Sequence, residues 1–210
     1  MPDALHPRIH TLAERYPALT VCAGSIQQAH DLMADSYRSG GKLLLCGNGG
    51  SAADADHISG ELLKGFGHGR PLGQADRDRL GPALADKLQG ALPAIPLPQF
   101  AALGTAYGND CDAAYAYAQL VHGLGKSGDV LFGISTSGNA QNVLLAIEVA
   151  HKKGLKTIGL TGARGGGLAK AVDCCIHAPE DETYRIQEYH LPIYHCLCLM
   201  LEDTFFPASG

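Results

Sequence analysis

Residues 128–139 read Gly-Asp-Val-Leu-Phe-Gly-Ile-Ser-Thr-Ser-Gly-Asn, and this stretch decides the fold. Its uninterrupted apolar run, Val130 to Ile134, is typical of a strand buried on both faces. A hydroxyl-rich turn follows directly, and a helical pattern runs from Asn139 to His151. The stretch therefore predicts a strand, a tight turn and a helix, which together form the repeating unit of a parallel sheet.

The same unit recurs along the chain. Apolar runs predict strands at 43–46, 94–97, 130–134, 157–160 and 174–177. Helical patterns lie between them at 52–63, 100–107, 113–122, 139–151 and 168–172. This alternation predicts an α/β fold: a five-stranded parallel, doubly wound sheet of the flavodoxin-like kind, sandwiched by helices.

Helices are also expected at both ends of the chain. Two N-terminal helices are predicted at 9–16 and 25–37, within a helical segment that we place at 1–40. A long last helix is predicted from about Thr183 to Phe205, with a kink at Pro192. We therefore expect a single domain over residues 1–210.

Composition limits the classes of function. The chain has 210 residues, 27 glycines and a formal net charge of −5. A general nucleic-acid binder needs a basic face, which this balance of charges does not favour. No apolar run is long enough to span a membrane, and residues 1–35 lack a signal-peptide core. We expect a cytoplasmic protein that binds neither nucleic acid nor a membrane directly.

The seven cysteines are odd in number, form no C-x-x-C pair and lie mostly in apolar runs. They are predicted to be reduced and buried. One segment, 65–93, interrupts the alternation with six glycines and three prolines, and is too long for an ordinary connection. Within it the sequence indicates a short helix near 82–88. The segment is either a lid over an active site, of this chain or of a neighbour, or a solvated loop. If the segment is a lid, its basic residues would face the active site. If it is a solvated loop, they would pair with the aspartates of the same segment. The basic residues are Arg70, Arg77, Arg79 and Lys87, and the aspartates are Asp76, Asp78 and Asp86.

Two loops follow predicted strands and open helices, which is where α/β folds bind ligands. One is Gly47 to Asp54 and the other is Ser135 to Asn139. Glycines let backbone N–H groups approach an anion, and hydroxyl groups add further donors. The first loop lacks the Gly-Lys-Ser/Thr ending of a P-loop and the third glycine of a dinucleotide fingerprint. The pair of loops favours a small phosphorylated metabolite as ligand.

Possible metal ligands lie on two predicted helices. His57 and Glu61 are four residues apart on one helix face, a spacing that suits two ligands of one zinc ion. On the last helix Gln187 could act with either His190 or His195. Spacing favours His190 over His195, and an isolated helical histidine is more often structural. The residues alone therefore indicate a metal site with two good ligands and leave the others open.

The chain resembles the sugar isomerase (SIS) domain family and, within it, the phosphoheptose isomerases. The resemblance covers the chain from the N-terminal helices to Glu202. Its distinctive segments are 46–51, 54–62, 108–110, 128–139, 160–162 and 185–190. Two departures from the family pattern are Ala140, in place of a phosphate-loop serine, and Tyr184, in place of an aspartate. The insertion, roughly residues 72–89, is also longer than the family pattern suggests.

The resemblance implies a set of site residues. It places one Zn²⁺ per subunit on His57, Glu61, Gln187 and His195, with Glu61 and His195 as catalytic base and acid. It places sugar-phosphate contacts on Asn48, Gly49, Gly50, Ser51, Asn109, Asp110, Ser135, Thr136, Ser137 and Gln187. It further implies a homotetramer with active sites at subunit interfaces, to which the segment 1–40 contributes.

The implied reaction converts D-sedoheptulose 7-phosphate to D-glycero-D-manno-heptose 7-phosphate through a metal-stabilised enediol. This is the first step of ADP-heptose synthesis for bacterial surface lipopolysaccharide. The alternative is a non-catalytic tetramer of the same fold, the DnaA initiator-associating protein, which serves as an assembly hub in replication initiation. The presence of His57, Glu61 and His195 favours the enzyme. A sugar-phosphate-sensing regulator would need a DNA-binding module as well.

Overall fold

A computed structural model describes residues 5–207 and confirms the predicted α/β fold. Five parallel strands form one sheet in the order β2-β1-β3-β4-β5. Their bounds are β1 Leu43–Cys46, β2 Ala94–Pro96, β3 Val130–Ile134, β4 Lys156–Thr161 and β5 Cys174–His177. The order reverses between β1 and β3, which pair from Leu43 with Val130 to Cys46 with Gly133. The loops after these two strands therefore emerge side by side.

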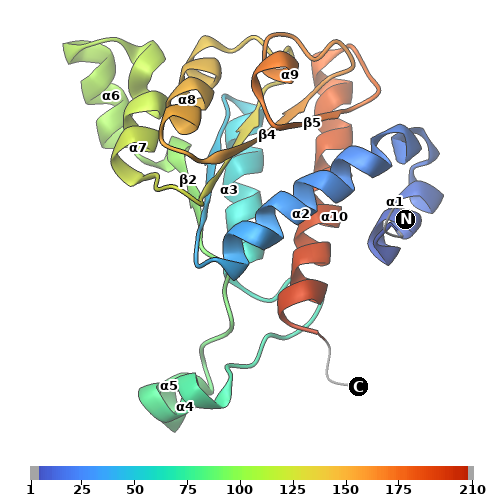
Figure 1. Ribbon diagram of the computed structural model, residues 1–210, viewed down its shortest axis with the longest axis vertical. Coiled ribbons are helices and arrows are strands. Elements are labelled where there is room, and N and C mark those ends of the chain that lie inside the picture. Colours follow the sequence, from blue (N-terminus) through green and yellow to red (C-terminus); the bar gives the residue numbers. More distant parts are fainter. Residues whose placement is uncertain (1–4, 208–210) are drawn as a thin grey trace.

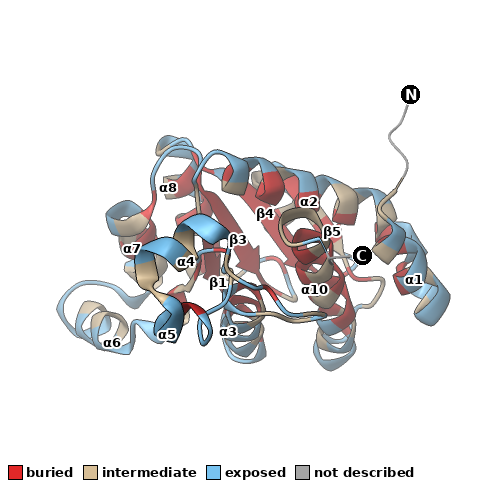
Figure 2. Ribbon diagram, turned by 90° about the horizontal axis from the view of Figure 1, so that it is seen from below, coloured by how far each residue is buried: buried red, intermediate tan, exposed pale blue. Residues whose placement is uncertain are grey.

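Helices cover both faces of the sheet (Figure 1). Because side chains alternate along a strand, Leu43 and Leu45 pack on one face of the sheet, and Leu44 and Cys46 on the other. The first face is covered by α1 Pro7–Arg15, α2 Ala23–Arg38, α3 Gly50–Leu63 and α10 Thr183–Phe205. The second is covered by α7 Ala116–Leu124, α8 Gln141–Lys152 and α9 Leu168–Ala171. Figure 2 shows the strands as the buried centre between these layers.

Shorter elements complete the chain. Short 3₁₀ helices occur at Pro17–Cys22, Leu97–Gln99 and Ala113–Tyr115. Helix α6, Ala101–Asp110, contains no buried residue and lies at the rim. Helix α10 continues through Pro192, as a single helix of 23 residues. Within residues 5–207, no helix combines the length and the apolarity that a membrane span requires.

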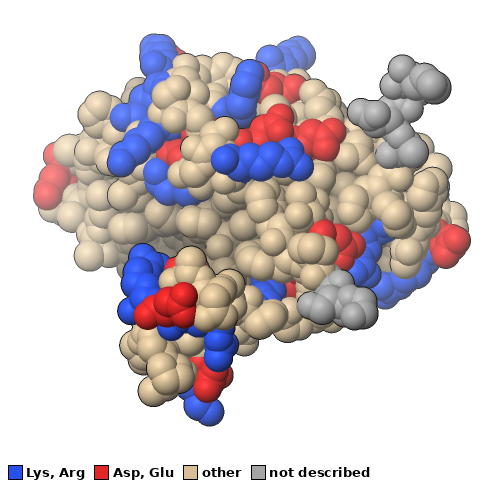
Figure 3. All heavy atoms as spheres, turned by 60° about the horizontal axis from the view of Figure 1, so that its bottom comes forward, with Lys and Arg blue, Asp and Glu red and all other residues tan. Residues whose placement is uncertain are grey.

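The 65–93 segment forms an arm of two short helices, α4 Gln74–Leu80 and α5 Pro82–Ala85. The sequence indicated a short helix near 82–88 and missed α4. Figure 1 shows the arm leaving the end of α3 that is remote from the loops after β1 and β3. Figure 3 shows acidic and basic side chains interleaved on the arm. Two of the proposed ion pairs form, Arg77 with Asp86 and Arg79 with Asp76.

Arg70 does not belong to a basic lid, and that expectation was wrong for this residue. Its side chain is completely buried and pairs with the equally buried Glu202 of α10, with an Nε–Oε1 distance of 2.7 Å. Arg70 also donates to the carbonyl oxygens of Leu62 and Glu61, where α3 ends. Glu202 accepts backbone hydrogen bonds from Phe66 and Gly67. A buried ion pair with all these partners fixes the base of the arm to the core.

The cysteines are all free, as predicted. Five of them are buried, at positions 22, 46, 174, 196 and 198. Cys175 is half-buried and Cys111 is exposed after α6, so the expectation of burial was wrong for Cys111. Burial raises the pKa of the Cys46 thiol to about 12, which makes this thiol unreactive at neutral pH.

Candidate active site

An amide pair joins the loop after β1 to the first turn of α8, the helix that follows the loop after β3. Asn48 Nδ2 donates to Asn142 Oδ1, and Asn142 Nδ2 donates back to Asn48 Oδ1, both at 2.9 Å. Asn142 Oδ1 also accepts from the backbone N–H of Val143 in the first turn of α8. The sequence reasoning missed Asn142, since an amide at the start of a helix gives no sign of a partner 94 residues away.

The first loop fits closely against α10. A Cβ on Gly50 would lie 2.3 Å from Gln187 Nε2, so a larger residue there would displace the Gln187 side chain from the loop. Gly49, just before α3, has a φ of +56°, a conformation that strongly favours glycine. Gln187 therefore reaches the loop from the first turns of α10, and Ser51 lies buried in the first turn of α3. The structure thus brings Asn48, Gly49, Gly50, Ser51 and Gln187 together.

The second loop is held by the turn that follows β4. Gly138 has a φ of +66°, and a Cβ there would lie 2.0 Å from the carbonyl oxygen of Gly165. The Asn139 side chain donates to the Ser137 carbonyl and accepts from the Gly167 N–H, so it clamps the two turns together. Ser135 is buried, Thr136 is half-buried and Ser137 is exposed. Thr136 and Ser137 line a hollow of about 180 Å³ between these turns.

A second group of candidate residues lies between α3 and α10. His57 Nε2 is 3.1 Å from Glu61 Oε1, as expected for residues one helical turn apart. The His57 and His195 rings face each other edge-on, with centroids 5.0 Å apart. Lys64 Nζ lies 2.9 Å from the other Glu61 oxygen. Two of the other proposed metal ligands, Glu61 and His195, are therefore neighbours of His57.

His190 lies elsewhere. Its side chain is fully buried, with Nδ1 3.9 Å from Asp54 Oδ2 and Nε2 3.5 Å from the carbonyl oxygen of Thr161. Of the two histidines that the spacing left open, His195 is the one beside His57. Residue spacing favoured His190 because spacing describes α10 as an isolated helix. The packing of α10 on α3 decides which face of α10 meets His57.

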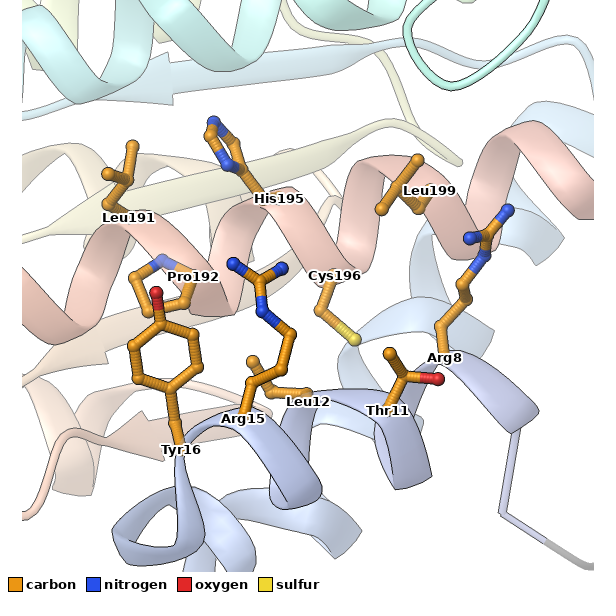
Figure 4. Close-up of a pocket in the computed structure, with 10 residues that line it drawn as sticks. All are labelled: Arg8, Thr11, Leu12, Arg15, Tyr16, Leu191, Pro192, His195, Cys196 and Leu199. Carbon is orange, nitrogen blue, oxygen red and sulfur yellow. The ribbon is translucent and has the colours of Figure 1, made fainter.

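The environment of His195 favours a neutral imidazole. Burial, and after it the nearby His57 ring, lower the pKa of His195, while Glu61 opposes this shift. The Arg15 guanidinium lowers the same pKa further. Figure 4 shows Arg15 reaching from α1 toward α10, at the edge of a groove of about 380 Å³ between the two helices.

The donor set suits zinc by its chemistry. Two imidazoles and a carboxylate are preferred zinc ligands, and His195 Nε2 is buried without a hydrogen-bond partner among the described residues. Within residues 5–207, however, no three His, Cys, Asp or Glu side chains are gathered closely enough to hold a metal ion. Gln187 lies against Gly50 in the first loop. The residues therefore fit zinc in kind, and binding would draw their side chains together.

Asn109 and Asp110 stand apart from both groups. They lie exposed at the end of α6, and their only side-chain hydrogen bond among the described residues joins Asn109 Nδ2 to Asp110 Oδ1 at 2.7 Å. The chain by itself does not bring these two candidates to the loops. The pairing of Arg70 with Glu202 was also missed, although a glutamate following the apolar run 196–201 was an available signal of a buried pair.

The sequence is similar to a known protein family and to several of its members. A family model described as the SIS domain matches residues 12–77 and 78–162. The phosphoheptose isomerase of Rhodospirillum rubrum is 40% identical over 204 residues, 97% of this chain and 98% of that protein. The phosphoheptose isomerase of Akkermansia muciniphila is 34% identical over 206 residues, 98% of this chain and 99% of that protein.

Solved structures of similar proteins share the fold. A phosphoheptose isomerase from Francisella tularensis superposes with a TM-score of 0.77 at 32% identity, covering 92% of this chain and 93% of that one. The enzyme of the same name from Neisseria gonorrhoeae gives a TM-score of 0.73 at 33% identity, covering 93% and 92%. The similarity therefore extends over the helices and loops that carry both groups of candidate residues.

Proposed function

The chain belongs to the SIS domain family and is a sugar-phosphate isomerase, and from that premise we propose that it converts D-sedoheptulose 7-phosphate to D-glycero-D-manno-heptose 7-phosphate. Relatives named phosphoheptose isomerase, matched over nearly their full length, support this substrate. The product would enter ADP-heptose synthesis for lipopolysaccharide. The same names favour catalysis over the assembly-hub alternative.

The observation that carries the proposal is that α3 and α10 each contribute to both groups of residues. Ser51 and Gln187 lie at the phosphate loops, whereas His57, Glu61 and His195 lie further along the same two helices. From Ser51 the helix rises about 9 Å to His57 and about 15 Å to Glu61. A long open-chain sugar phosphate could span this separation, with its phosphate in the loops and its first two carbons near Glu61. Remote binding of this kind fixes the reacting carbons in place.

The chemistry requires a base and a proton donor. In our proposal Glu61 removes the proton from C1 of the ketose, and a proton returns to C2 of the resulting enediol. His195, held neutral by its surroundings, would donate a hydrogen bond to the developing enediolate oxygen, as a neutral imidazole can. Lys64 neutralises one side of Glu61 and leaves the carboxylate oxygen beside His57 facing the cluster.

We propose that His57, Glu61, Gln187 and His195 hold one zinc ion per subunit. When bound, the ion would act as a Lewis acid on the carbonyl and enediolate oxygens. A carboxylate shared with zinc is a weaker base, so Glu61 would have to exchange between ligand and base during turnover. The unpartnered, buried Nε2 of His195 is the feature of this chain that supports the site.

We also propose a cytoplasmic homotetramer with active sites between subunits, to which residues 1–40 contribute. The site is open on the isolated chain, where 42% of the His57 side chain is exposed. Apolar side chains are exposed on neighbouring elements, with Val21 77% and Leu191 42% exposed. Sedimentation equilibrium checks the assembly, and a monomer at micromolar concentration would contradict it.

The reaction is tested by incubating the purified enzyme with D-sedoheptulose 7-phosphate in D₂O and analysing the sugars by NMR. The expected result is deuterium at C2 of an aldose heptose phosphate, together with close to one zinc per subunit by elemental analysis. Isomerisation by protein that contains no zinc would contradict the proposed metal site but support the proposed reaction. Absence of deuterium from both sugars, in protein that contains zinc, would contradict the substrate assignment.

A further inference from the structure

Helix α3, which carries Glu61, is capped at its end by a side chain from the arm. The helix ends at Leu63, and Lys64 continues in an extended conformation, with φ −143° and ψ 172°. The last four carbonyl oxygens of an α-helix have no partner inside the helix. Arg70 donates to two of them, from Nη1 to Leu62 at 2.7 Å and from Nη2 to Glu61 at 3.0 Å. A cation at this place also suits the negative end of the helix dipole.

The same guanidinium is bonded to α10. Its Nε lies 2.7 Å from Glu202 Oε1, and both side chains are completely buried. The Phe206 ring lies beside the guanidinium, with its centroid 4.9 Å from Arg70 Cζ. All three nitrogens of the planar group therefore donate, Nε to α10 and the two Nη atoms to α3. Because a guanidinium is a rigid fork, these bonds fix where the end of α3 lies relative to α10.

The two helix segments joined in this way carry the proposed base and its partner. The carbonyl oxygen of Glu61 is itself one of the two that Arg70 holds. On α10, His195 precedes Glu202 by seven residues, which is about 10.5 Å of rise and about 20° short of two full turns. Both side chains therefore lie on one face of α10, the face on which the His195 ring meets the His57 ring of α3. One guanidinium thus fixes the backbone of Glu61 against the helix that holds His195.

We infer that Arg70 is a positioning residue for the isomerisation, which sets the place of Glu61 relative to His195 by capping α3 while it is paired with Glu202. The inference rests on the proposed function, in which Glu61 is the base and His195 donates to the enediolate oxygen. A misplacement of about 1 Å at an active site can lower a rate about 10²-fold. Arg70 lies at the base of the arm, so the start of the inserted segment serves catalysis whatever its tip does.

Two variants separate positioning from stability. Arg70→Lys keeps a positive charge beside Glu202, but a single ammonium cannot reach the carboxylate and both carbonyl oxygens as the fork does. Arg70→Met/Glu202→Gln removes both charges together, so neither is left buried and unpaired. The new glutamine oxygen can still accept from the Phe66 and Gly67 N–H groups, as the carboxylate does. Both proteins should fold, which urea unfolding checks, and neither can cap α3 as the wild type does.

Steady-state kinetics with D-sedoheptulose 7-phosphate is the first measurement, made where every variant is fully folded. We expect kcat to fall about 10–100-fold in the double variant and less in Arg70→Lys. KM should stay nearly unchanged, because Ser51 and the first phosphate loop lie at the other end of α3. Wild-type kcat in the folded double variant, or a raised KM with unchanged kcat, would overturn the inference. If the double variant does not fold, Arg70→Lys decides by the same criteria.

Lys42→Met is the matched control. Lys42 Nζ lies 2.6 Å from Asp129 Oδ2 in another largely buried ion pair. Among the described residues, neither partner makes a side-chain hydrogen bond to α3 or α10. The variant should lower the urea midpoint and keep the wild-type kcat. A similar fall of kcat in this control would show that kcat follows stability alone, and it would overturn the positioning role.

Hydrogen exchange, followed by mass spectrometry, needs no substrate. Amides of residues 58–64, at the end of α3, should exchange faster in both Arg70 variants than in the wild type, whereas residues 50–56 at its start should not. Lys42→Met should change neither segment. Unchanged exchange at 58–64 in both Arg70 variants would overturn the inference. If the wild type does not isomerise the heptulose phosphate, the proposed function is wrong, while the exchange rates still decide whether Arg70 holds the end of α3.

Discussion

Glu61 is held on both sides, with His57 Nε2 3.1 Å from one carboxylate oxygen and Lys64 Nζ 2.9 Å from the other. Glu61→Gln keeps the size of the side chain and removes the proposed base. General-base catalysis contributes about 10²–10⁴-fold, so kcat should fall by that factor while the substrate Kd changes little. Steady-state kinetics and calorimetric titration measure the two quantities.

The control for this variant is Glu148→Gln. Glu148 is an exposed glutamate on α8, paired with Lys152 at 2.7 Å, so the variant makes the same change of charge away from the candidate site. Its kcat should match the wild type. Turnover of Glu61→Gln at the wild-type rate would remove Glu61 from the mechanism.

Ser137 presents its hydroxyl at the second loop, where the residue is exposed. A hydrogen bond to a charged group contributes about 1.5–3 kcal/mol, so Ser137→Ala should raise KM about tenfold or more and leave kcat nearly unchanged. Initial-rate measurements over a range of substrate concentrations separate the two constants. Ser127→Ala, an exposed serine just before β3, is the control. An unchanged KM in Ser137→Ala would count against the phosphate role.

At the scale of elements, the buried contacts between the arm and the core, among residues 5–207, lie mainly at the base of the arm. Helix α4 buries no residue, and Ala85 is the one buried residue of α5. At the base, by contrast, Arg70 and Glu202 are completely buried, and a Cβ on Gly90 would lie 2.3 Å from the Phe206 ring. The arm and its base therefore contribute very differently to stability.

Replacing residues 73–88 with a short Gly-Ser linker should change the free energy of unfolding by about 1 kcal/mol or less, because little apolar area is lost. Arg70→Ala should cost about 3–5 kcal/mol, since it leaves Glu202 charged, buried and unpaired. Urea denaturation of both variants measures the difference. Equal losses in the two variants would contradict this division.

The kinetics of the arm deletion decide between the two hypotheses for the segment. Unchanged kcat and KM in a folded protein would favour a solvated arm whose charges pair with one another, as the Arg77–Asp86 and Arg79–Asp76 contacts already suggest. A higher KM would favour a cover over the site of a neighbouring subunit.

Most of the elements could be predicted because each is encoded locally. The run Val130–Ile134 is apolar on both faces and can only be a central strand, and the glycines at 47, 49, 50 and 138 mark the loops. Contacts between distant segments were harder to predict. Asn142 bonds to Asn48, and Tyr194 to His57, across 94 and 137 residues, and no periodic pattern reports such pairs. Helix α4 escaped prediction because it has no apolar face.

For the molecule as a whole, pH affects stability in two stages. Burial and neighbouring cations lower the pKa of His195 below 6.5, and burial and His30 lower that of His6. The folded state therefore binds fewer of these protons than the unfolded state, and stability is lost as the pH falls below about 6.5. Glu202 and Asp203 add a second stage, because their pKa values lie below the ordinary 4.5 and 3.8.

The second stage has the same sign. Burial alone would raise the pKa of Glu202, but hydrogen bonds from Phe66, Arg70 and Gly67 lower this pKa by more. For Asp203 the main cause is the hydrogen bond from Arg8. Both carboxylates stabilise the fold above their ordinary pKa values, and this contribution is lost as the pH falls through their folded values. Urea midpoints should decline slightly below pH 6.5 and steeply below about pH 4.5. A midpoint that stays constant down to pH 3.5 would contradict the assignment, and Asp203→Asn should make the second stage shallower.

The mutual amide pair between Asn48 and Asn142 joins the loop after β1 to the first turn of α8, although the two segments come from distant parts of the chain. Binding that has to order a loop costs free energy, and rigidity established during folding removes that cost. If these loops bind the phosphate as proposed, they would do so without first having to become ordered. Under the same proposal, a sugar phosphate with a shorter chain would leave its carbonyl short of Glu61. The loops would then discriminate substrates by chain length without any contact to the carbons between.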